Sequence, residues 1–295
     1  MNTRTLPEGI HEIIGTQSGP NVVIIGAMHG NERIGVDVIN MLKNECTPET
    51  IHGTLTLILG NPRAYEKNIR FIDEDLNRLF GENSKSTENQ ETYEQQRAFE
   101  LKPFLENANY LLDIHATIKP SIPFVFCEND EAHIELASLC NPEFIVSIGE
   151  NFRLPELISS TDNFVDSHGG IGITYESGWH KDPLAANEIL KIAKKFLKKI
   201  KCGFAEESAE ALYTNNGIRQ SRQLEINEKI TAKTDTFEFI DGIKTFFHIK
   251  NGGIIATDGG KNVTIEHDQF IIFPKENIAK DMTACYIATD TSHYL

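Results

Sequence analysis

The strongest constraint on the fold is an alternation, over the first two-thirds of the chain, between short apolar runs and segments of helical periodicity. Residues 21–26 (NVVIIG) form a β-branched run that ends in glycine, and residues 54–60 (TLTLILG) form a second, as expected of buried strands. Between them, Ile34, Val38 and Leu42 recur at helical spacing. Alternating strands and helices predict a mostly parallel sheet flanked by helices, which is an α/β fold.

The pattern changes after about residue 201. Up to that point we expect further strands at residues 110–114, 124–127, 144–148 and 171–175, and helices at residues 93–106 and 183–201. Beyond it, short strand-like segments are separated by Gly, Asn and Asp, which is the turn chemistry of a small all-β unit. We therefore predict an α/β domain over residues 1–203 and a smaller C-terminal all-β domain over residues 204–295.

Composition and charge exclude several classes of partner. The formal net charge of −15 disfavours nucleic acid and anionic membranes, because both require a basic footprint. No apolar run approaches the ~20 residues of a membrane-spanning helix, and the first residues lack the apolar stretch of a secretory signal. The five cysteines are scattered and odd in number, which indicates a reducing compartment. We expect a cytoplasmic protein that acts on a small molecule, and the sequence leaves open whether it forms a homo-oligomer.

Residues 26–35 (GAMHGNERIG) carry the most informative chemistry. They lie where a predicted strand ends and a predicted helix begins, and ligands of open α/β sheets gather at the carboxyl ends of the strands. His29 and Glu32 are three residues apart, and an imidazole with a carboxylate suits Zn²⁺. A third ligand is expected, and His115, at the end of the strand that follows, is the best candidate. Asp113 lies two residues earlier, on the same face, where it is placed to orient His115.

The alternative for each of these residues is an ordinary one. A histidine followed three residues later by glutamate is common by chance, and a single strand-end histidine is more often a surface residue than a ligand. The hypothesis of a metal site rests on both motifs falling at strand ends of one predicted sheet.

Cationic residues and one further glutamate complete the candidate site. Arg63, near a strand end, is placed to polarise a carbonyl or stabilise an oxyanion. Asn77 and Arg78 are suited to binding a carboxylate. Glu176 closes another predicted strand and is a candidate general base. On spacing alone, a solvated surface run in which Asp and Glu pair with the arginines is the better interpretation, and Glu176 is an unremarkable strand-end residue.

Taken together, the motifs GAMHGNE, GNPRAY, DEDLNRLF, DIH and YES, between residues 22 and 178, resemble the succinylglutamate desuccinylase and aspartoacylase family, which is related to the zinc carboxypeptidases. The resemblance implies a zinc-carboxypeptidase-like α/β domain followed by the family's C-terminal β domain. It also implies that His29, Glu32 and His115 bind one zinc ion per chain.

The same resemblance implies roles for the remaining residues. Arg63 would stabilise the oxyanion, Asn77 and Arg78 would bind the substrate carboxylate, and Glu176 would act first as general base and then as acid. The expected reaction is zinc-dependent removal of a succinyl or acetyl group from an N-acyl acidic amino acid by an activated water.

Two points remain open at the level of sequence. Residues 116–121 (ATIKPS) match neither branch of the family cleanly, and Lys119 and Arg153 are hypotheses for additional cationic contacts with the substrate. A zinc carboxypeptidase acting on peptides, or a non-catalytic binding module on the same scaffold, are the alternative functions.

Overall fold

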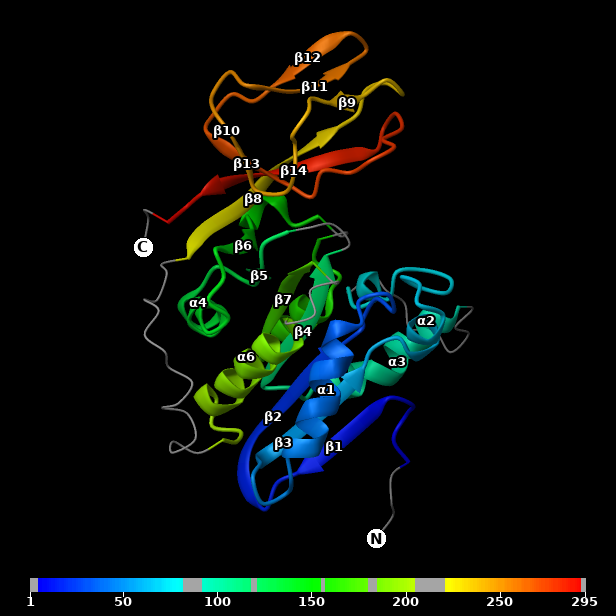
Figure 1. The fold of residues 1–295 in the computed structure, drawn as a ribbon, viewed down its shortest axis with the longest axis vertical. Coiled ribbons are helices and arrows are strands. Elements are labelled where there is room, and N and C mark those ends of the chain that lie inside the picture. Colours follow the sequence, from blue (N-terminus) through cyan, green and yellow to red (C-terminus); the bar gives the residue numbers. More distant parts are fainter. Residues whose placement is uncertain are drawn as a thin grey trace. The chain divides into compact units, whose positions relative to one another are not determined.

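Residues 5–81, 92–117, 121–154, 157–179, 185–204 and 221–292 are described in a computed structural model. The chain divides into two compact units, shown with their elements in Figure 1. The first unit comprises Met1–Glu143 and Leu154–Gln220, and the second comprises Phe144–Arg153 and Ser221–Leu295.

The first unit is built on a mixed sheet whose centre is parallel. Its strands, in spatial order, are β1 (Ile10–Ile14), β3 (His52–Leu59), β2 (Gln17–Gly26), β4 (Tyr110–Thr117), β7 (Ile171–Trp179) and β5 (Phe124–Phe126). The strands β3, β2, β4 and β7 run parallel to one another, whereas β1 and β5 pair antiparallel with β3 and β7. The expectation of a mostly parallel sheet is confirmed at its centre, and the carboxyl ends of β2, β4 and β7 meet at one edge.

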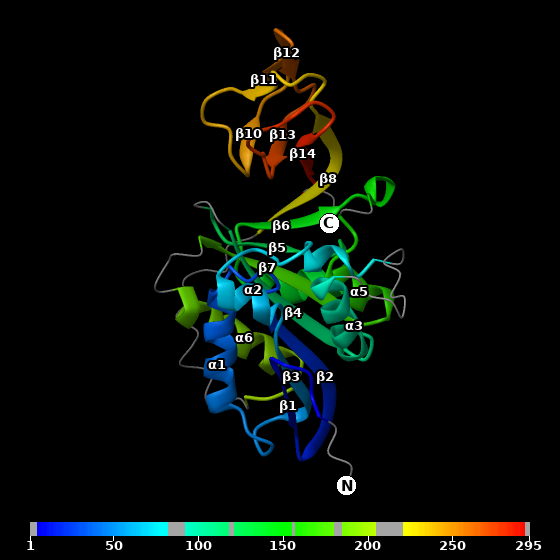
Figure 2. The same ribbon diagram turned by 90° about the vertical axis from the view of Figure 1, so that its right-hand side faces the viewer.

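Helices lie on both sides of this sheet. Figure 2 shows α1 (Ile34–Glu45) and α6 (Ala185–Lys199) on one side, and α3 (Tyr93–Leu105) and α5 (Thr161–Ser167) on the other. The helix α1 buries the residues that predicted it, Ile34, Val38 and Leu42. Shorter helical segments are α2 (Pro62–Lys67), the 3₁₀ turn η1 (Leu76–Arg78) and α4 (Glu131–Ser138).

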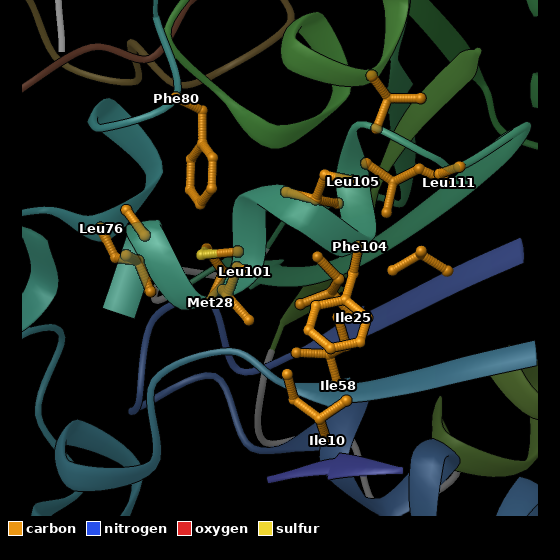
Figure 3. Packing of buried hydrophobic residues seen from close by; sticks show 14 residues of the cluster. Ile10, Ile25, Met28, Ile58, Leu76, Phe80, Leu101, Phe104, Leu105 and Leu111 are labelled. Atoms are coloured by element: carbon orange, nitrogen blue, oxygen red, sulfur yellow. The ribbon is translucent and has the colours of Figure 1, made fainter. Parts of the chain in front are cut away.

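The hydrophobic core between the sheet and α3 is drawn in Figure 3. Val23 and Ile25 of β2 pack in one cluster with Leu101 and Phe104 of α3. The intervening residues of β2 are also buried and point to the opposite face, because side chains alternate along a strand. A central strand covered on both faces explains why this segment is a continuous apolar run rather than an alternating one.

The second unit is composed of strands apart from one 3₁₀ turn, as far as its described residues show. One sheet has the order β6 (Phe144–Ile148), β8 (Arg222–Thr231), β14 (Thr283–Asp290), β13 (Gln269–Ile272) and β10 (Phe247–Ile249). A small antiparallel sheet contains β12 (Lys261–Thr264), β11 (Ile254–Asp258) and β9 (Glu238–Phe239), and the 3₁₀ turn is η2 (Glu150–Phe152). The proposed boundary near residue 203 differs from this division because β6 pairs in parallel with β8 and so lies with the second unit.

Several short elements were not predicted from the sequence: β1, α2, α4 and α5. Each is too short to show a distinct hydrophobic period. Two of the helices begin at side-chain caps: the side chain of Asn61 accepts a hydrogen bond from the backbone N–H of Ala64 in α2, and the Asp130 carboxylate accepts hydrogen bonds from the first turn of α4. No helix among the described residues combines the length and apolar character needed to cross a membrane.

An ionic contact joins α4, α5 and β7 of the first unit. His133 Nδ1 lies 2.7 Å from Asp130 Oδ2, and its Nε2 lies 3.0 Å from Asp166 Oδ1. The same Asp166 oxygen accepts a 2.7 Å hydrogen bond from the backbone N–H of Gly172 at the start of β7. Burial alone would lower the pKa of His133, but the two carboxylates raise it above its ordinary value of 6.5.

This contact predicts a dependence of stability on pH. Because the pKa of His133 is higher in the folded chain, its contribution is fully present below pH 6.5 and is lost as the pH rises through the folded-state value. In that pH window, the free energy of unfolding changes by at most about 1.4 kcal/mol per pH unit for one proton. Urea unfolding of the wild type and of His133→Gln between pH 6 and 9 measures it. The free energy of unfolding of the wild type should fall more over this range than that of His133→Gln. The control is His168→Gln, which replaces an exposed histidine and should follow the wild type. Parallel pH profiles would contradict the assignment.

Candidate metal centre and active site

The loop between β2 and α1 is held in a tight conformation. A Cβ atom at Gly26 would lie 2.5 Å from the carbonyl carbon of Gly35, so glycine at these positions lets the start of the helix pack directly on the end of the strand. Ala27 follows with a φ of 52°, a left-handed conformation that costs a non-glycine residue about 1–2 kcal/mol. Strained backbone of this kind clusters at functional sites. His29 and Glu32 lie in the turn just before α1, which begins at Ile34, rather than in its first turn.

The structure brings the three residues predicted as metal ligands together. His29 Nδ1 lies 2.7 Å from Glu32 Oε1, and His115 Nδ1 lies 2.9 Å from Glu32 Oε2. All three side chains are buried, and one potential ligand atom from each lies within 4.8 Å of the other two. His115 is near the carboxyl end of β4, so the cluster forms where β2 and β4 end side by side. Two imidazoles and a carboxylate are a donor set that a single Zn²⁺ ion accepts.

Carboxylates lie behind both imidazoles. His29 Nε2 is 3.1 Å from Asp75 Oδ1, and His115 Nε2 is 3.3 Å from Asp113 Oδ2. Each imidazole thus turns Nδ1 toward Glu32 and Nε2 toward a carboxylate. Metal-ligating histidines have this arrangement, in which the outer carboxylate sets the tautomer and orients the ring.

The charges within the cluster are strongly coupled. Burial opposes ionisation of Glu32, but His29 and His115 outweigh it and hold the pKa of its carboxyl well below the usual range. Burial likewise opposes protonation of His115, but Asp113 and Glu32 hold its pKa well above 6.5. The cluster therefore favours a positive charge at its centre, where protons and a metal ion are alternatives.

Glu176 lies beside the cluster on the neighbouring strand. It is the register partner of His115 in the parallel pairing of β4 and β7. The residue is half-buried, but its Oε2 atom is buried and has no hydrogen-bond partner among the described residues. Burial raises the pKa of Glu176 to about 7, with His115 acting against the shift and Glu32 adding to it. A carboxylate with a pKa near neutrality is suited to accept and return a proton.

The arginine beside the cluster is Arg70, which the sequence did not single out. Its Nη2 donates to Asp75 Oδ2 at 2.8 Å, and its Nη1 lies 3.7 Å from Glu32 Oε1. Arg63 is exposed in α2, and its guanidinium lies 4.4 Å above the ring of Tyr93. The geometry thus favours Arg70 over Arg63 for a contact with a bound substrate.

Asn77 and Arg78 lie on η1, directly after Asp75, whose side chain caps this turn. Asn77 is buried, and its Oδ1 accepts a 3.2 Å hydrogen bond from the backbone N–H of Thr161. Arg78 is exposed, and its Nη1 donates to the carbonyl of Asn77 at 2.9 Å. Of the other two cations considered, Arg153 belongs to the second unit and Lys119 lies outside the described residues.

The loop that carries Arg70 and Asp75 is anchored by a glutamate that sequence reasoning also missed. Glu94 is fully buried at the start of α3, and its carboxylate accepts hydrogen bonds from the backbone N–H groups of Ile72 at 2.7 Å and Asp73 at 3.0 Å. Its position in the first turn of a predicted helix resembled that of a solvent-exposed residue, so the sequence alone offered no signal.

Comparison with known proteins agrees with this geometry. A family model described as the succinylglutamate desuccinylase/aspartoacylase catalytic domain matches residues 18–200, which include all three residues of the cluster and Glu176. The chain belongs to this family.

Curated members of the succinylglutamate desuccinylase/aspartoacylase family match the chain over most of its length. The succinylglutamate desuccinylase of Erwinia tasmaniensis is 24% identical over 96% of this chain and 89% of that protein. The enzyme of the same name from Shewanella denitrificans is 27% identical over 89% of this chain and 80% of that protein.

Solved structures share the fold of this chain. The succinylglutamate desuccinylase of Vibrio cholerae superimposes with a TM-score of 0.73 at 18% identity, covering 96% of this chain and 85% of that one. A product-bound ectoine utilization protein of Ruegeria pomeroyi superimposes with a TM-score of 0.70 at 17% identity, covering 95% and 88%.

Proposed function

We propose that this chain is a zinc-dependent hydrolase that removes the acyl group, succinyl or acetyl, from an N-acylated acidic amino acid. The observation that carries the proposal is the cluster of His29, Glu32 and His115, with Glu176 on the adjacent strand, in a member of this family. The curated relatives named as succinylglutamate desuccinylases support the reaction class.

The donor set fits zinc in its catalytic form. Three protein ligands leave one position of a tetrahedral ion for water or substrate. The atoms that would hold the ion are His29 Nδ1, His115 Nδ1 and a carboxylate oxygen of Glu32, because both Nε2 atoms face other carboxylates. When bound, zinc supplies a Lewis acid that polarises the acyl carbonyl and lowers the pKa of a water molecule.

Glu176 is proposed to move the proton. Its carboxylate would accept a proton from the water that attacks the amide carbon and would return it to the nitrogen as the C–N bond breaks. The products are then a carboxylic acid and a free amino acid. Burial raises the pKa of this carboxyl in the metal-free site, which favours its holding a proton between the two transfers.

Cationic groups at the edge of the site are proposed to bind the anionic parts of the substrate. Arg70 is the arginine beside the cluster, and we assign to it, rather than to Arg63, the stabilisation of the developing oxyanion. Asn77 and Arg78 are proposed to bind a carboxylate of the substrate, because a guanidinium next to an amide suits that group. In a chain with a net charge of −15, these groups supply the local positive field that an acidic substrate needs.

The buried cysteines support a reducing compartment. Those that the structure describes, Cys46, Cys127, Cys140, Cys202 and Cys285, are all free and buried. We propose that the enzyme acts in the cytoplasm.

Deacylation of a substrate panel tests the proposed function. We expect the zinc-loaded protein to release amino acid from one of N-succinylglutamate, N-acetylglutamate and N-acetylaspartate, measured by amine detection. Blocked peptides in the same assay distinguish the alternatives. Turnover of peptides alone would instead identify a zinc carboxypeptidase, and a zinc content near zero would favour a non-catalytic binding module.

A further inference from the structure

Thr161, the first residue of α5, contacts the carboxylate that lies behind a proposed metal ligand. Its side chain is fully buried, and its Oγ1 donates a 2.5 Å hydrogen bond to Asp113 Oδ2. That same oxygen lies 3.3 Å from His115 Nε2, which is an ion-pair distance, and this nitrogen makes no hydrogen bond among the described residues. The three groups form a row from the hydroxyl of Thr161 through the carboxylate of Asp113 to the imidazole of His115.

The hydroxyl of Thr161 makes the one hydrogen bond to this carboxylate among the described residues. Asp113 is fully buried on β4, and its other oxygen, Oδ1, has no hydrogen-bond partner among the described residues. A buried carboxylate with few partners depends strongly on each one, because removing a hydrogen bond from a buried charged group carries a larger cost than removing one from a neutral group. Thr161 thus holds the carboxylate that faces Nε2 of His115, while Glu32 contacts Nδ1 of the same ring.

The backbone of Thr161 also contacts the other side of the site. Its N–H donates a 3.2 Å hydrogen bond to Asn77 Oδ1. This bond does not require the threonine side chain, so a substitution at position 161 separates the two contacts. Loss of the hydroxyl affects the row toward His115 and leaves the contact with Asn77 in place.

A neighbouring threonine provides a comparison at similar depth. Thr174 on β7 is the register partner of Asp113, and it is buried like Thr161. Its Oγ1 has no hydrogen-bond partner among the described residues. Removal of this hydroxyl changes the packing next to Asp113 without removing a hydrogen bond.

We propose that Thr161 is a positioning residue for the metal centre, which acts by holding Asp113 so that Asp113 orients His115. The inference rests on the proposed function only in requiring that the His29, Glu32 and His115 cluster binds a metal ion. It does not depend on which amide the enzyme cleaves.

The test compares zinc binding by the full chain and its variants. Zinc dissociation constants of the wild type, Thr161→Val, Thr161→Ser and Thr174→Val are measured by competition with a chromophoric chelator. Loss of an outer contact of this kind typically weakens metal binding about 10–100-fold, and we expect a loss in that range for Thr161→Val. Thr161→Ser, which keeps the hydroxyl, and Thr174→Val should bind zinc like the wild type.

A second readout separates positioning from general damage to the fold. At saturating zinc, Thr161→Val should lower kcat while KM for the acyl amino acid stays close to the wild-type value, because the backbone contact with Asn77 remains. Wild-type zinc affinity in Thr161→Val would overturn the proposal. Equal losses of zinc affinity in Thr161→Val and Thr174→Val would also overturn it, and so would weakened zinc binding in Thr161→Ser. If Thr161→Val is not recovered folded, Thr161→Ala removes the same hydroxyl and is judged by the same outcomes. Thr161→Val could bind zinc more weakly while the wild type cleaves none of the substrate panel. That outcome would support the role of Thr161 and reject the proposed substrate class.

Discussion

Replacing Glu176 by glutamine should lower kcat for deacylation by about 10²–10⁴-fold, the range that a positioned general acid–base contributes. Glutamine keeps the size of the side chain but cannot take a proton from water. Glu176 lies opposite His115 on the adjacent strand, and burial raises the pKa of its carboxyl in the metal-free site. Because it is not among the three proposed ligands, zinc content should stay unchanged.

Steady-state kinetics and metal analysis of the same Glu176→Gln preparations check this prediction. Glu188→Gln serves as the control, because Glu188 lies on α6 with an exposed side chain paired with Lys191. Unchanged kcat in Glu176→Gln would exclude Glu176 as the base. Loss of zinc in that variant would show instead that Glu176 belongs to the metal centre.

Replacing Glu32 by glutamine should have the second large effect, on metal binding itself. Glu32 contacts both imidazoles and also accepts a 3.1 Å hydrogen bond from the backbone N–H of Ala116. Glutamine preserves the volume but removes the charge that a divalent cation requires. The loss of zinc affinity should exceed the about 10–100-fold expected for a residue behind the ligands.

Activity should follow the metal. A bound metal supplies several kcal/mol of transition-state stabilisation, and each 1.36 kcal/mol is tenfold in rate, so turnover of Glu32→Gln at limiting zinc should fall by about 10³-fold or more. Excess zinc should restore part of it. Glu45→Gln, at the other end of α1, is the matched control, because its carboxylate pairs with Lys194 on the surface.

Thermal unfolding gives an independent measure of the same site. For the wild type, zinc at about 1,000 times its dissociation constant should add about 4 kcal/mol to the free energy of unfolding. The corresponding rise in Tm should be much reduced in Glu32→Gln and present in Glu45→Gln. A zinc-induced shift in Glu32→Gln as large as that of the wild type would mean that the ion binds elsewhere.

The course of the chain from residue 70 to residue 78 shows why tertiary structure was needed to assign the arginines. Arg63 and Arg70 both follow the second predicted strand, and the sequence favoured Arg63 because it lies nearer the end of that strand. The choice depends on the buried Glu94 of α3, which binds the backbone of residues 72 and 73 and so directs the loop toward the cluster. Arg63 instead lies over Tyr93.

The meeting of the three proposed metal ligands was predictable, because it depends on local signals. His29, Glu32 and His115 lie at the ends of strands whose apolar runs are local signals, and the carboxyl ends of neighbouring parallel strands must meet at one edge of the sheet. The longer strands and helices and the sheet class therefore follow from the sequence by itself, because each depends on apolar patterns that are local in the chain. The short elements β1, α2, α4 and α5 gave no such pattern.

Only the tertiary structure decided which distant residues meet. The pairing of β6 with β8 places residues 144–153 with the second unit, and the hydrogen bond from Thr161 to Asp113 spans 48 residues. Such contacts leave no periodic pattern in the sequence, because they depend on how packed elements approach one another rather than on the properties of either segment alone.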